Sequence, residues 1–278
     1  MDGPRAYLQR PFTFLRLASS IMPVRALLRL VNPRQAATHR IPDGQRIYAV
    51  GDIHGRLDLL DDLLTQIAAD DAARSRAQTE IVFLGDLVDR GPDSRGVVDR
   101  LLSFSKGPTP ARFLLGNHEE VFLRALTGDL KALRFFGRIG GRETIRSYGF
   151  SEEEYRGLDY EALSARLVER VPTEHIAFLS SFEDMIEIGD YLFVHAGIRP
   201  GVDFAAQETS DLRWIREDFL RCKDSFGKFI IHGHTITEAV DVQPNRIGID
   251  TGAFDSGRLT AIGLEGADRW FLETGAAS

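Results

Sequence analysis

Short apolar runs alternate with segments of helical apolar spacing in the part of the chain that follows Arg46. Three such runs, at residues 47–50, 81–84 and 112–115, predict buried strands. Between them the apolar residues recur every three or four positions, which predicts two helices, one over residues 57–67 and one over residues 97–102. Strands that alternate with helices form parallel sheets through right-handed crossovers, so the pattern predicts an α/β fold.

The second half of the chain changes character twice. Residues 120–181 have helical spacing and no strand alternation, and no proline-rich or serine-rich linker brackets them, so they are interpreted as an inserted helical cap. Six apolar runs then predict further strands, at residues 185–188, 191–194, 228–231, 246–249, 259–262 and 269–272. Strands in this number predict two packed sheets with helices on the outside.

The charge distribution separates residues 1–40 from residues 41–278. The first segment contains seven arginines and one acid, which gives +6, and the remainder sums to −13 because the whole chain of 278 residues carries −7. An acidic body argues against a protein that binds nucleic acid. We expect the basic amphipathic arm 1–40 to pack on the acidic body, and contact with an anionic membrane surface is the less favoured alternative. No apolar run in the sequence is long enough to span a bilayer.

The cysteine content restricts the redox chemistry. Cys222 is the single cysteine, so no internal disulfide can form, and it lies outside every motif described below. A single thiol fits a reducing compartment, and we expect a cytoplasmic location. Nothing in the sequence indicates the oligomeric state.

Five short motifs combine oxygen and imidazole ligands. They are Gly51-Asp52-Ile53-His54-Gly55, the run from Gly85 to Gly91 (GDLVDRG), Gly116-Asn117-His118-Glu119, His195-Ala196-Gly197 and Gly233-His234-Thr235. Each begins at or just after a predicted strand, and the carboxyl ends of strands are where open α/β sheets keep their sites. Ligands of this kind, without thiolate, suit Mn, Fe and Zn. We therefore expect two divalent ions, with Mn favoured and Fe or Zn as alternatives.

The ligands divide between two ions. The short turn at Asp52 and His54 can hold the first ion together with Asp86, whose two carboxylate oxygens can bridge to the second. The second ion would be held by Asp86, Asn117, His195 and His234. A water shared by two such ions loses a proton near neutral pH and becomes a hydroxide nucleophile.

Further polar residues in the motifs suggest how a phosphoryl group is handled. His118 follows a predicted ligand directly and is a candidate general acid, and Asp89 could orient its imidazole. Arg90 and Arg216 are candidates for binding the phosphate through planar, bidentate donors. For the second arginine, Arg199 and Arg213 compete with Arg216.

These motifs, in this order and spacing, resemble those of the metallophosphoesterases of the phosphoprotein phosphatase family, in its bacterial and phage branch. The resemblance runs from about Ile47 to Leu264. It implies a calcineurin-like fold, an αββα sandwich of two mixed sheets flanked by helices, with the helical cap inserted. It also implies the metal ligands, the acid pair and the arginines assigned above, and a Trp-x-Arg match at Trp214 to Arg216 supports the second arginine.

The resemblance points to two substrate classes. Asp89 and Glu119 are typical of protein phosphatases, whereas the segments Gly140–Thr144 and Ile249–Ala253 are closer to bacterial diadenosine tetraphosphatase-like proteins. Many members have an arginine where this chain has Leu115. The favoured hypothesis is a phosphatase for phosphoserine and phosphothreonine, and for phosphotyrosine by extension. A symmetrical dinucleoside tetraphosphate hydrolase is the alternative, and a non-catalytic scaffold is weaker because no predicted ligand is missing.

Several residues near the motifs are interpreted as structural. His232 is adjacent to a ligand motif but is expected to have a structural role, and His39 and His175 are expected to be surface or hydrogen-bonded histidines. Asp250 could hydrogen-bond a ligand histidine or serve as a turn residue at a strand end. The aromatic residues Phe135, Phe136 and Trp214 are expected in the core.

Overall fold

A computed structural model describes residues 39–275 of the chain. Within that range the strands are β1 (Gln45–Val50), β2 (Gln78–Phe83), β3 (Ala111–Phe113), β4 (Met185–Ile188), β5 (Tyr191–Val194), β6 (Phe229–His232), β7 (Asp241–Val242), β8 (Arg246–Gly248), β9 (Thr260–Glu265) and β10 (Asp268–Glu273). The helices are α1 (Leu57–Ala72), α2 (Ser94–Phe104), α3 (Asn117–Leu126), α4 (Leu130–Ile139), α5 (Gly141–Ser147), α6 (Glu152–Gly157), α7 (Tyr160–Arg170), α8 (Thr173–Ser180), η2 (a 3₁₀ helix, Phe204–Ala206), α9 (Thr209–Trp214), α10 (Glu217–Leu220) and α11 (Ala253–Ser256).

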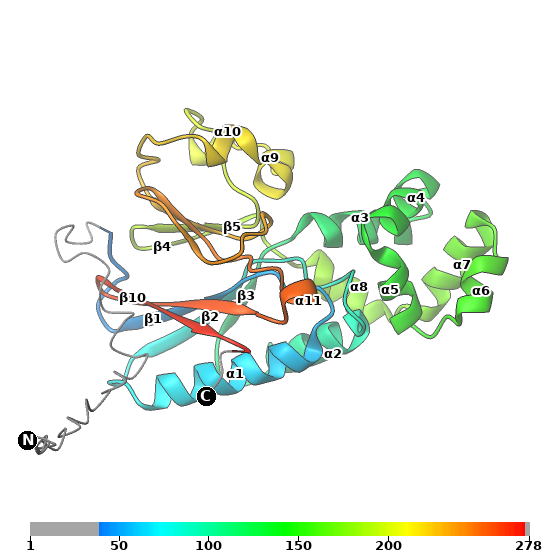
Figure 1. Cartoon of the computed structure of the whole chain (residues 1–278), viewed down its shortest axis with the longest axis horizontal. Helices are drawn as coiled ribbons and strands as arrows, with labels where there is room; N and C mark the ends of the chain where they lie inside the picture. The colour runs from blue at the N-terminus through cyan, green and yellow to red at the C-terminus, as the bar shows by residue number, and fades with distance from the viewer. Residues whose placement is uncertain (1–38, 276–278) are drawn as a thin grey trace, which may run out of the picture. The chain divides into compact units, whose positions relative to one another are not determined.

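The strands form two five-stranded mixed sheets (Figure 1). The first has the order β10-β9-β1-β2-β3, with β1, β2 and β3 parallel to one another, β9 antiparallel to β1, and β10 antiparallel to β9. The second has the order β4-β5-β6-β8-β7, with β5, β6 and β8 parallel and an antiparallel strand at each edge. The carboxyl ends of the two parallel trios are therefore the edges at which a site can be built.

Alternation along the strands divides the apolar side chains among three hydrophobic cores. On β1, Ile47 and Ala49 join a core between the two sheets, whereas Tyr48 and Val50 face a second core under α1, α2 and α3. On the second sheet, Leu192 faces a third core that α9 and α10 close with Leu212 and Phe219. Because successive strand residues point to opposite faces of the sheet, a strand that is apolar throughout contributes side chains to two cores, one on each face. The layers are helix, sheet, sheet and helix, which confirms the predicted αββα sandwich.

The predicted elements occur where the apolar pattern put them. Both helices between the first three strands are present, and each of the nine predicted strands has a counterpart among the ten of the described residues. The strand predicted at 112–115 is shorter than expected, because β3 ends at Phe113 and only an isolated bridge joins Leu114 to Glu183. The sequence pattern missed β7, η2, α9, α10 and α11, which are two to six residues long.

Six helices, α3 to α8, occupy residues 117–180 and so cover all but the last residue of the insertion predicted at 120–181. In Figure 1 α4, α5, α6 and α7 form a group beside the sheets rather than covering a face of either one. The predicted arm at residues 1–40 lies outside the described residues except for its last two positions. None of the described helices has the length and apolarity that a membrane-spanning helix needs.

Candidate metal centre and active site

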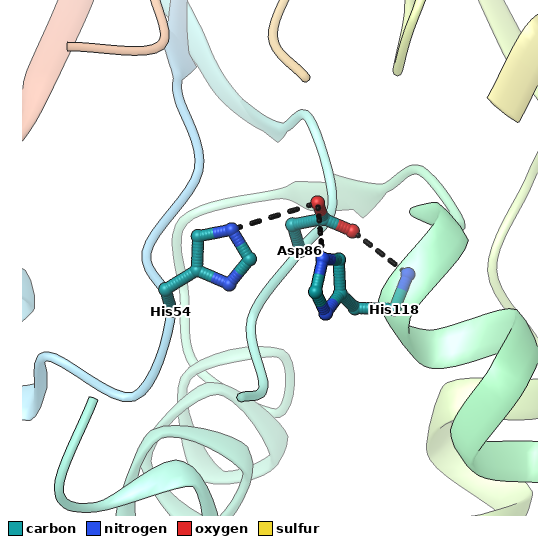
Figure 2. A group of neighbouring side chains, drawn as sticks. All are labelled: His54, Asp86 and His118. Carbon is teal, nitrogen blue, oxygen red and sulfur yellow. Dashed lines mark hydrogen bonds and ion pairs between the residues drawn. The ribbon is translucent and has the colours of Figure 1, made fainter. Parts of the chain in front are cut away.

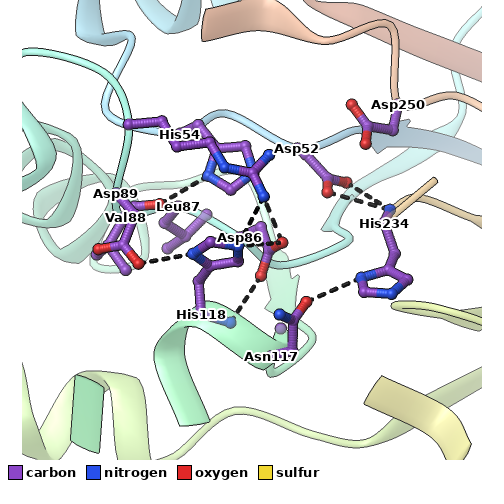
Figure 3. Close-up of polar contacts among 12 residues, drawn as sticks. Asp52, His54, Asp86, Leu87, Val88, Asp89, Asn117, His118, His234 and Asp250 are labelled. Atoms are coloured by element: carbon purple, nitrogen blue, oxygen red, sulfur yellow. Dashed lines mark hydrogen bonds and ion pairs between the residues drawn. The ribbon is translucent and has the colours of Figure 1, made fainter. Parts of the chain in front are cut away.

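All the predicted ligands lie at the carboxyl ends of parallel strands. Asp52 and His54 follow β1, Asp86 follows β2, and Asn117 is the first residue of α3, after β3. From the other sheet, His195 follows β5 directly and His234 lies two residues beyond β6. The two sheets therefore contribute to one site, as Figure 3 shows for most of these residues.

The side chains of Asp86, His54 and His195 meet deep inside the protein. Oδ2 of Asp86 lies 3.6 Å from Nε2 of His54 and 3.5 Å from Nε2 of His195, and all three residues are at most 2% exposed. Two groups have ligand atoms mutually within 4.8 Å, namely His54, Asp86 and His118, and Asp86, His195 and His234. Figure 2 shows the first of these groups. Asp86 belongs to both groups, which is the position expected of a bridging ligand.

Each ligand histidine is held by a backbone or amide contact that leaves a ring nitrogen for the site. Nδ1 of His54 bonds the carbonyl of Val88 at 2.8 Å, and Nδ1 of His195 bonds the carbonyl of Leu84 at 2.8 Å. Such contacts fix the tautomer and present Nε2 as the ligand atom. Burial lowers the pKa of His54 to about 3 and that of His234 to about 2, so both imidazoles are neutral, the form that binds metal.

Asn117 and His234 complete the second group. Oδ1 of Asn117 lies 3.0 Å from Nε2 of His195 and 2.8 Å from Nδ1 of His234. The amide oxygen therefore faces two imidazoles, as expected of a neutral ligand on the same ion. The site brings together all three members predicted for the second ion besides Asp86.

Asp52 is the one predicted carboxylate or imidazole ligand outside both groups. Both of its carboxylate oxygens accept a hydrogen bond from the backbone N–H of His234, at 3.1 and 3.0 Å. Burial, and then the nearby Asp250 carboxylate, hold the pKa of Asp52 well above its usual range. A buried carboxylate beside two other carboxylates has an unmet need for a cation. Its role as a ligand stays a prediction.

The donor set fits a pair of divalent ions. Nε2 of His54 and Nε2 of His234 are buried and have no hydrogen-bond partner among the described residues. Burying an acceptor without a partner costs free energy unless a cation or a water pairs with it. Burial disfavours the charged imidazole of His195, yet the Asp86 carboxylate outweighs it and raises the pKa of His195 to about 10.

The two members of the predicted acid pair, His118 and Asp89, are in contact. Nδ1 of His118 lies 2.6 Å from Oδ2 of Asp89, and both residues are buried. This contact directs Nε2 of His118 toward Asp86, 3.9 Å from its Oδ2. Burial opposes protonation of the imidazole, but the Asp86 and Asp89 carboxylates together hold the pKa of His118 above its usual value. A proton on His118 is the state that a general acid needs.

Arg90 lies beside the acid pair. Its Nη2 is 3.0 Å from Nε2 of His118, and its guanidinium lies over the ring of Phe254, 4.9 Å from the centroid. A guanidinium can only donate, so Nε2 of His118 is the acceptor in this arrangement. A phosphate bound by Arg90 would draw the guanidinium away and leave Nε2 free to carry a proton.

Of the three arginines considered for the second phosphate contact, two are committed elsewhere. Arg199 pairs with Asp211 at 2.5 Å and with Asp218 at 2.6 Å, and Arg213 pairs with Asp184 at 2.6 Å. Arg216 is exposed, and no hydrogen bond or ion pair joins its side chain to another described residue. Its charge is close enough to contribute to the lowered pKa of His234. Arg216 is thus the arginine of the three that remains available.

Glu119 has a structural role that the sequence did not assign. Its carboxylate accepts four backbone N–H bonds, from Asp86 (2.8 Å), Leu87 (2.8 Å), Val88 (3.1 Å) and Gly116 (3.1 Å). The glutamate is fully buried, and it clamps the loop that carries the bridging ligand. The signal in the sequence was its position three residues after Gly116 at the start of α3, the spacing of a capping box.

Other residues singled out in the sequence have structural contacts. His175 bonds Tyr148 and Asp99, and His232 bonds Gly233 and Arg246, so both are buried, paired histidines. Asp250 accepts from the N–H of Gly252 at 3.0 Å, which fits the turn interpretation. Phe136 is buried in the core, while Phe135 and Trp214 pack at its edge.

The backbone is strained at the site. The non-glycine residues with φ in the left-handed region, among those described, are His54 (46°), Asp86 (50°), Asp89 (75°), Arg90 (66°) and His234 (63°). All five are predicted site residues. Two glycines make room for the ligand carboxylates, because a Cβ on Gly116 would overlap Asp86 and a Cβ on Gly233 would overlap Asp52. Strain that collects at one place is typical of a functional site.

Comparisons with known proteins agree on the family. The model of the calcineurin-like phosphoesterases matches residues 45–269. An asymmetrical bis(5'-nucleosyl)-tetraphosphatase of Anoxybacillus flavithermus is 26% identical over 236 residues, covering 77% of this chain and 88% of that protein. A symmetrical bis(5'-nucleosyl)-tetraphosphatase of Ralstonia nicotianae is 28% identical over 220 residues, covering 78% of this chain and 62% of that protein. A crystal structure of a proposed diadenosine tetraphosphatase has a TM-score of 0.58 at 23% identity, covers 84% of this chain and 96% of that one, and supports the fold.

Proposed function

Since this chain belongs to the calcineurin-like phosphoesterase family and is a metallophosphoesterase, we propose that it hydrolyses the polyphosphate bridge of dinucleoside tetraphosphates. The curated relatives support this substrate class, because both the asymmetrical and the symmetrical enzymes named above act on bis(5'-nucleosyl) tetraphosphates. The asymmetrical relative is matched over most of its own length, so the similarity extends beyond the motifs. This substrate was the alternative in the sequence analysis, and the relatives favour it over the protein phosphatase.

The structural observation that carries the phosphoester chemistry of the proposal is the meeting of two ligand groups at Asp86. Asp86 shares its carboxylate with His54 on one side and with His195 and His234 on the other. A pair of divalent ions held there would supply Lewis acidity for the phosphoryl oxygens and a nucleophile at neutral pH. We infer that the ligands are the six residues predicted from the sequence: Asp52, His54, Asp86, Asn117, His195 and His234.

The remaining residues of the site bind phosphate and move a proton. Arg90 would hold the phosphoryl group from the side of the acid pair, and Arg216 would approach it from the loop before α10. His118, held by Asp89 through Nδ1, would deliver the proton on Nε2 to the leaving oxygen. Oriented donors of this kind contribute most when they are fixed before the reaction, and the strained turns fix them.

A protein phosphatase remains the second candidate, for a chemical reason. A serine or threonine alkoxide is a strongly basic leaving group, whereas a nucleotide phosphate is a much weaker base and gains less from a proton. The buried His118–Asp89 pair is therefore worth more to a phosphomonoesterase of proteins than to a hydrolase of polyphosphate anhydrides.

One assay separates the two substrates. The full chain, purified and loaded with Mn²⁺, would be given diadenosine tetraphosphate and, separately, a panel of phosphoserine and phosphothreonine peptides. We expect the larger kcat/KM on the dinucleotide. The nucleotide products identify the cut, because two molecules of ADP indicate symmetrical cleavage, and ATP with AMP indicates asymmetrical cleavage.

Asp86→Asn serves as the blank, because it removes the shared carboxylate and keeps the shape of the side chain. Activity that survives in this variant would come from a contaminant. A larger kcat/KM on the peptides would overturn the dinucleotide proposal in favour of the protein phosphatase.

A further inference from the structure

The helical insertion reaches back to the acid pair through one buried hydroxyl. Thr144 lies on α5, within the segment Gly140–Thr144, and its side chain is 0% exposed. Its Oγ1 donates to Oδ1 of Asp89 at 2.6 Å. The other oxygen of the same carboxylate, Oδ2, holds Nδ1 of His118. A chain of hydrogen bonds thus runs from α5 through Asp89 to the imidazole.

The Thr144 hydroxyl has no spare capacity. It accepts from the backbone N–H of Asp89 at 2.8 Å, and its one proton goes to Oδ1 of that residue. Oγ of Ser94 lies 2.9 Å away and fills the remaining lone pair as a donor, since the threonine proton is already used. The Asp89 N–H also reaches Oγ of Ser94 at 3.0 Å. Because the proton and both lone pairs of the Thr144 hydroxyl are occupied, the hydroxyl holds the Asp89 carboxylate in one rotamer.

The same segment holds the next residue of the loop. The backbone N–H of Arg90 donates to the carbonyl of Gly140 at 3.0 Å, and a Cβ on Gly140 would overlap the Arg90 side chain. Asp89 and Arg90 both have positive φ and would relax without support. The insertion therefore holds this turn at two points, the Asp89 side chain through Thr144 and the Arg90 backbone through Gly140.

We propose that Thr144 is a positioning residue for proton transfer, acting through Asp89 on His118. The role rests on the proposed function, because it requires His118 to be the general acid. Without the threonine hydroxyl, Oδ1 of the buried Asp89 loses its donor, and the carboxylate is free to rotate away from Nδ1 of His118. Proton delivery to the leaving oxygen then loses its alignment, while phosphate binding by Arg90 is retained.

The test compares Thr144→Val, which keeps the shape and removes the hydroxyl, with Thr144→Ser, which keeps the hydroxyl. Both would be measured in the Mn²⁺-loaded full chain on phenyl phosphate and p-nitrophenyl phosphate. We expect Thr144→Val to lower kcat on phenyl phosphate by roughly 10- to 100-fold, the usual cost of losing an outer hydrogen-bond partner, with little change in KM. On p-nitrophenyl phosphate, whose leaving group needs little protonation, the loss should be several-fold smaller. Thr144→Ser should behave like the wild type.

The His118→Asn background distinguishes the two levels of the hypothesis. If Thr144→Val acts through His118, it should lower activity no further in that background. Equal losses on both substrates, or an additional loss in the His118→Asn background, would overturn the role of Thr144 alone. If His118→Asn itself fails to discriminate between the substrates, the general acid of the proposed function is wrong, and the role of Thr144 falls with it.

Thr144→Val could lose activity because it is less stable, so a second measurement that does not depend on activity is needed. Proton NMR spectroscopy supplies it. In the metal-free full chain, the short bond at Nδ1 of His118 should give a far-downfield proton resonance, assigned by its absence in His118→Asn. Ser94→Ala removes the donor to Thr144 and one of the two hydroxyl oxygens that the Asp89 N–H reaches, but it keeps the Thr144 hydroxyl on Oδ1 of Asp89. It should therefore shift this resonance upfield by less than Thr144→Val. A resonance that neither variant moves would contradict the proposal.

Discussion

At the scale of single residues, His118 makes the sharpest prediction. Replacing it with asparagine should lower turnover by on the order of 10²–10⁴, the range for loss of a general acid. The loss should be larger on an alkyl phosphate than on p-nitrophenyl phosphate, because an alkoxide cannot leave without a proton. Rates on both substrates, with metal content measured in parallel, check this. Equal losses would mean that His118 has another role, such as ligating the ion beside His54.

The clamp formed by Glu119 predicts a loss of metal affinity. Glu119→Gln replaces a carboxylate that accepts four backbone N–H bonds with an amide that has a single oxygen. The amide NH₂ group then faces backbone N–H groups, and donors that face each other cannot bond. The Asp86 loop should then loosen, and the Mn²⁺ affinity should fall by roughly 10- to 100-fold, as measured by calorimetric titration. Glu153→Gln, the same change at an exposed position, is the control and should bind like the wild type. Equal Mn²⁺ affinities in the two variants would contradict the proposed role of Glu119 in holding the Asp86 loop.

At the site, the sequence predicts residues better than it predicts their supports. The strand-end motifs identify Asp86, Asn117 and the histidines because one short run contains both the strand signal and the ligand. The contacts of Glu119 and Thr144 with the site escape such reasoning, since Asp86 lies 33 positions from Glu119 and Asp89 lies 55 positions from Thr144. The choice of Arg216 over its two competitors also needed the ion pairs of Arg199 and Arg213, which no sequence pattern predicts.

At the scale of elements, the buried guanidinium of Arg46 ties β1 to its neighbours. It pairs with Asp71 at the end of α1 (2.6 Å) and with Glu265 on β9 (2.9 Å), and it is 1% exposed. The side chains of Asp71 and Glu265 are 35% and 30% exposed, so water partly screens both pairs. Loss of the guanidinium should therefore cost less than the roughly 3–5 kcal/mol that is typical of a fully buried pair.

We therefore expect Arg46→Met to lower the free energy of unfolding by about 1–3 kcal/mol, as measured by urea denaturation. Arg76→Met, at an exposed position four residues beyond α1, is the matched control and should change it by less than about 0.5 kcal/mol. A similar small effect in both variants would show that the cluster of charges is replaceable by apolar packing.

The elements that the sequence missed share a physical reason. The strand β7 has two residues, and α10 and α11 have four each, which is too short for an apolar period to show. They form because tertiary contacts hold them, such as the burial of Phe219 from α10 against the second sheet. The longer α1 and the strands β1 and β2 could be predicted because each repeats its own pattern over six residues or more.

At the scale of the whole molecule, the buried tyrosines predict sensitivity to alkali. Burial raises the pKa of Tyr48, Tyr148 and Tyr191 above the ordinary value. The folded protein keeps these phenols neutral where the unfolded chain ionises them, so their contribution to stability is complete below about pH 10 and is lost as the pH rises further.

Urea midpoints at pH 8, 9.5 and 11 should therefore fall mainly over the last interval. The absorbance of tyrosinate near 295 nm should rise together with unfolding. Tyrosinate that forms in the folded protein, well before the midpoint shifts, would contradict the burial argument.

The position of the ligands between the sheets predicts that metal stabilises the whole fold. Asp52, Asp86 and Asn117 come from one sheet and His195 and His234 from the other, so bound ions would join the two. Mn²⁺ at a hundred times its Kd should add about 2.7 kcal/mol and raise the melting temperature relative to protein in EDTA. Asp86→Asn should lose this shift. An unchanged melting temperature at Mn²⁺ concentrations that support turnover would place the ions elsewhere.

The five left-handed residues also affect how the protein can be engineered. Each non-glycine residue held at such a φ costs about 1–3 kcal/mol, and glycine would relieve that cost. A library selected only for heat resistance should therefore accumulate glycine at His54, Asp86, Asp89, Arg90 and His234 and lose catalysis before it loses the core. Retention of those five side chains among the survivors would be a simple diagnostic that selection had acted on activity as well as on durability.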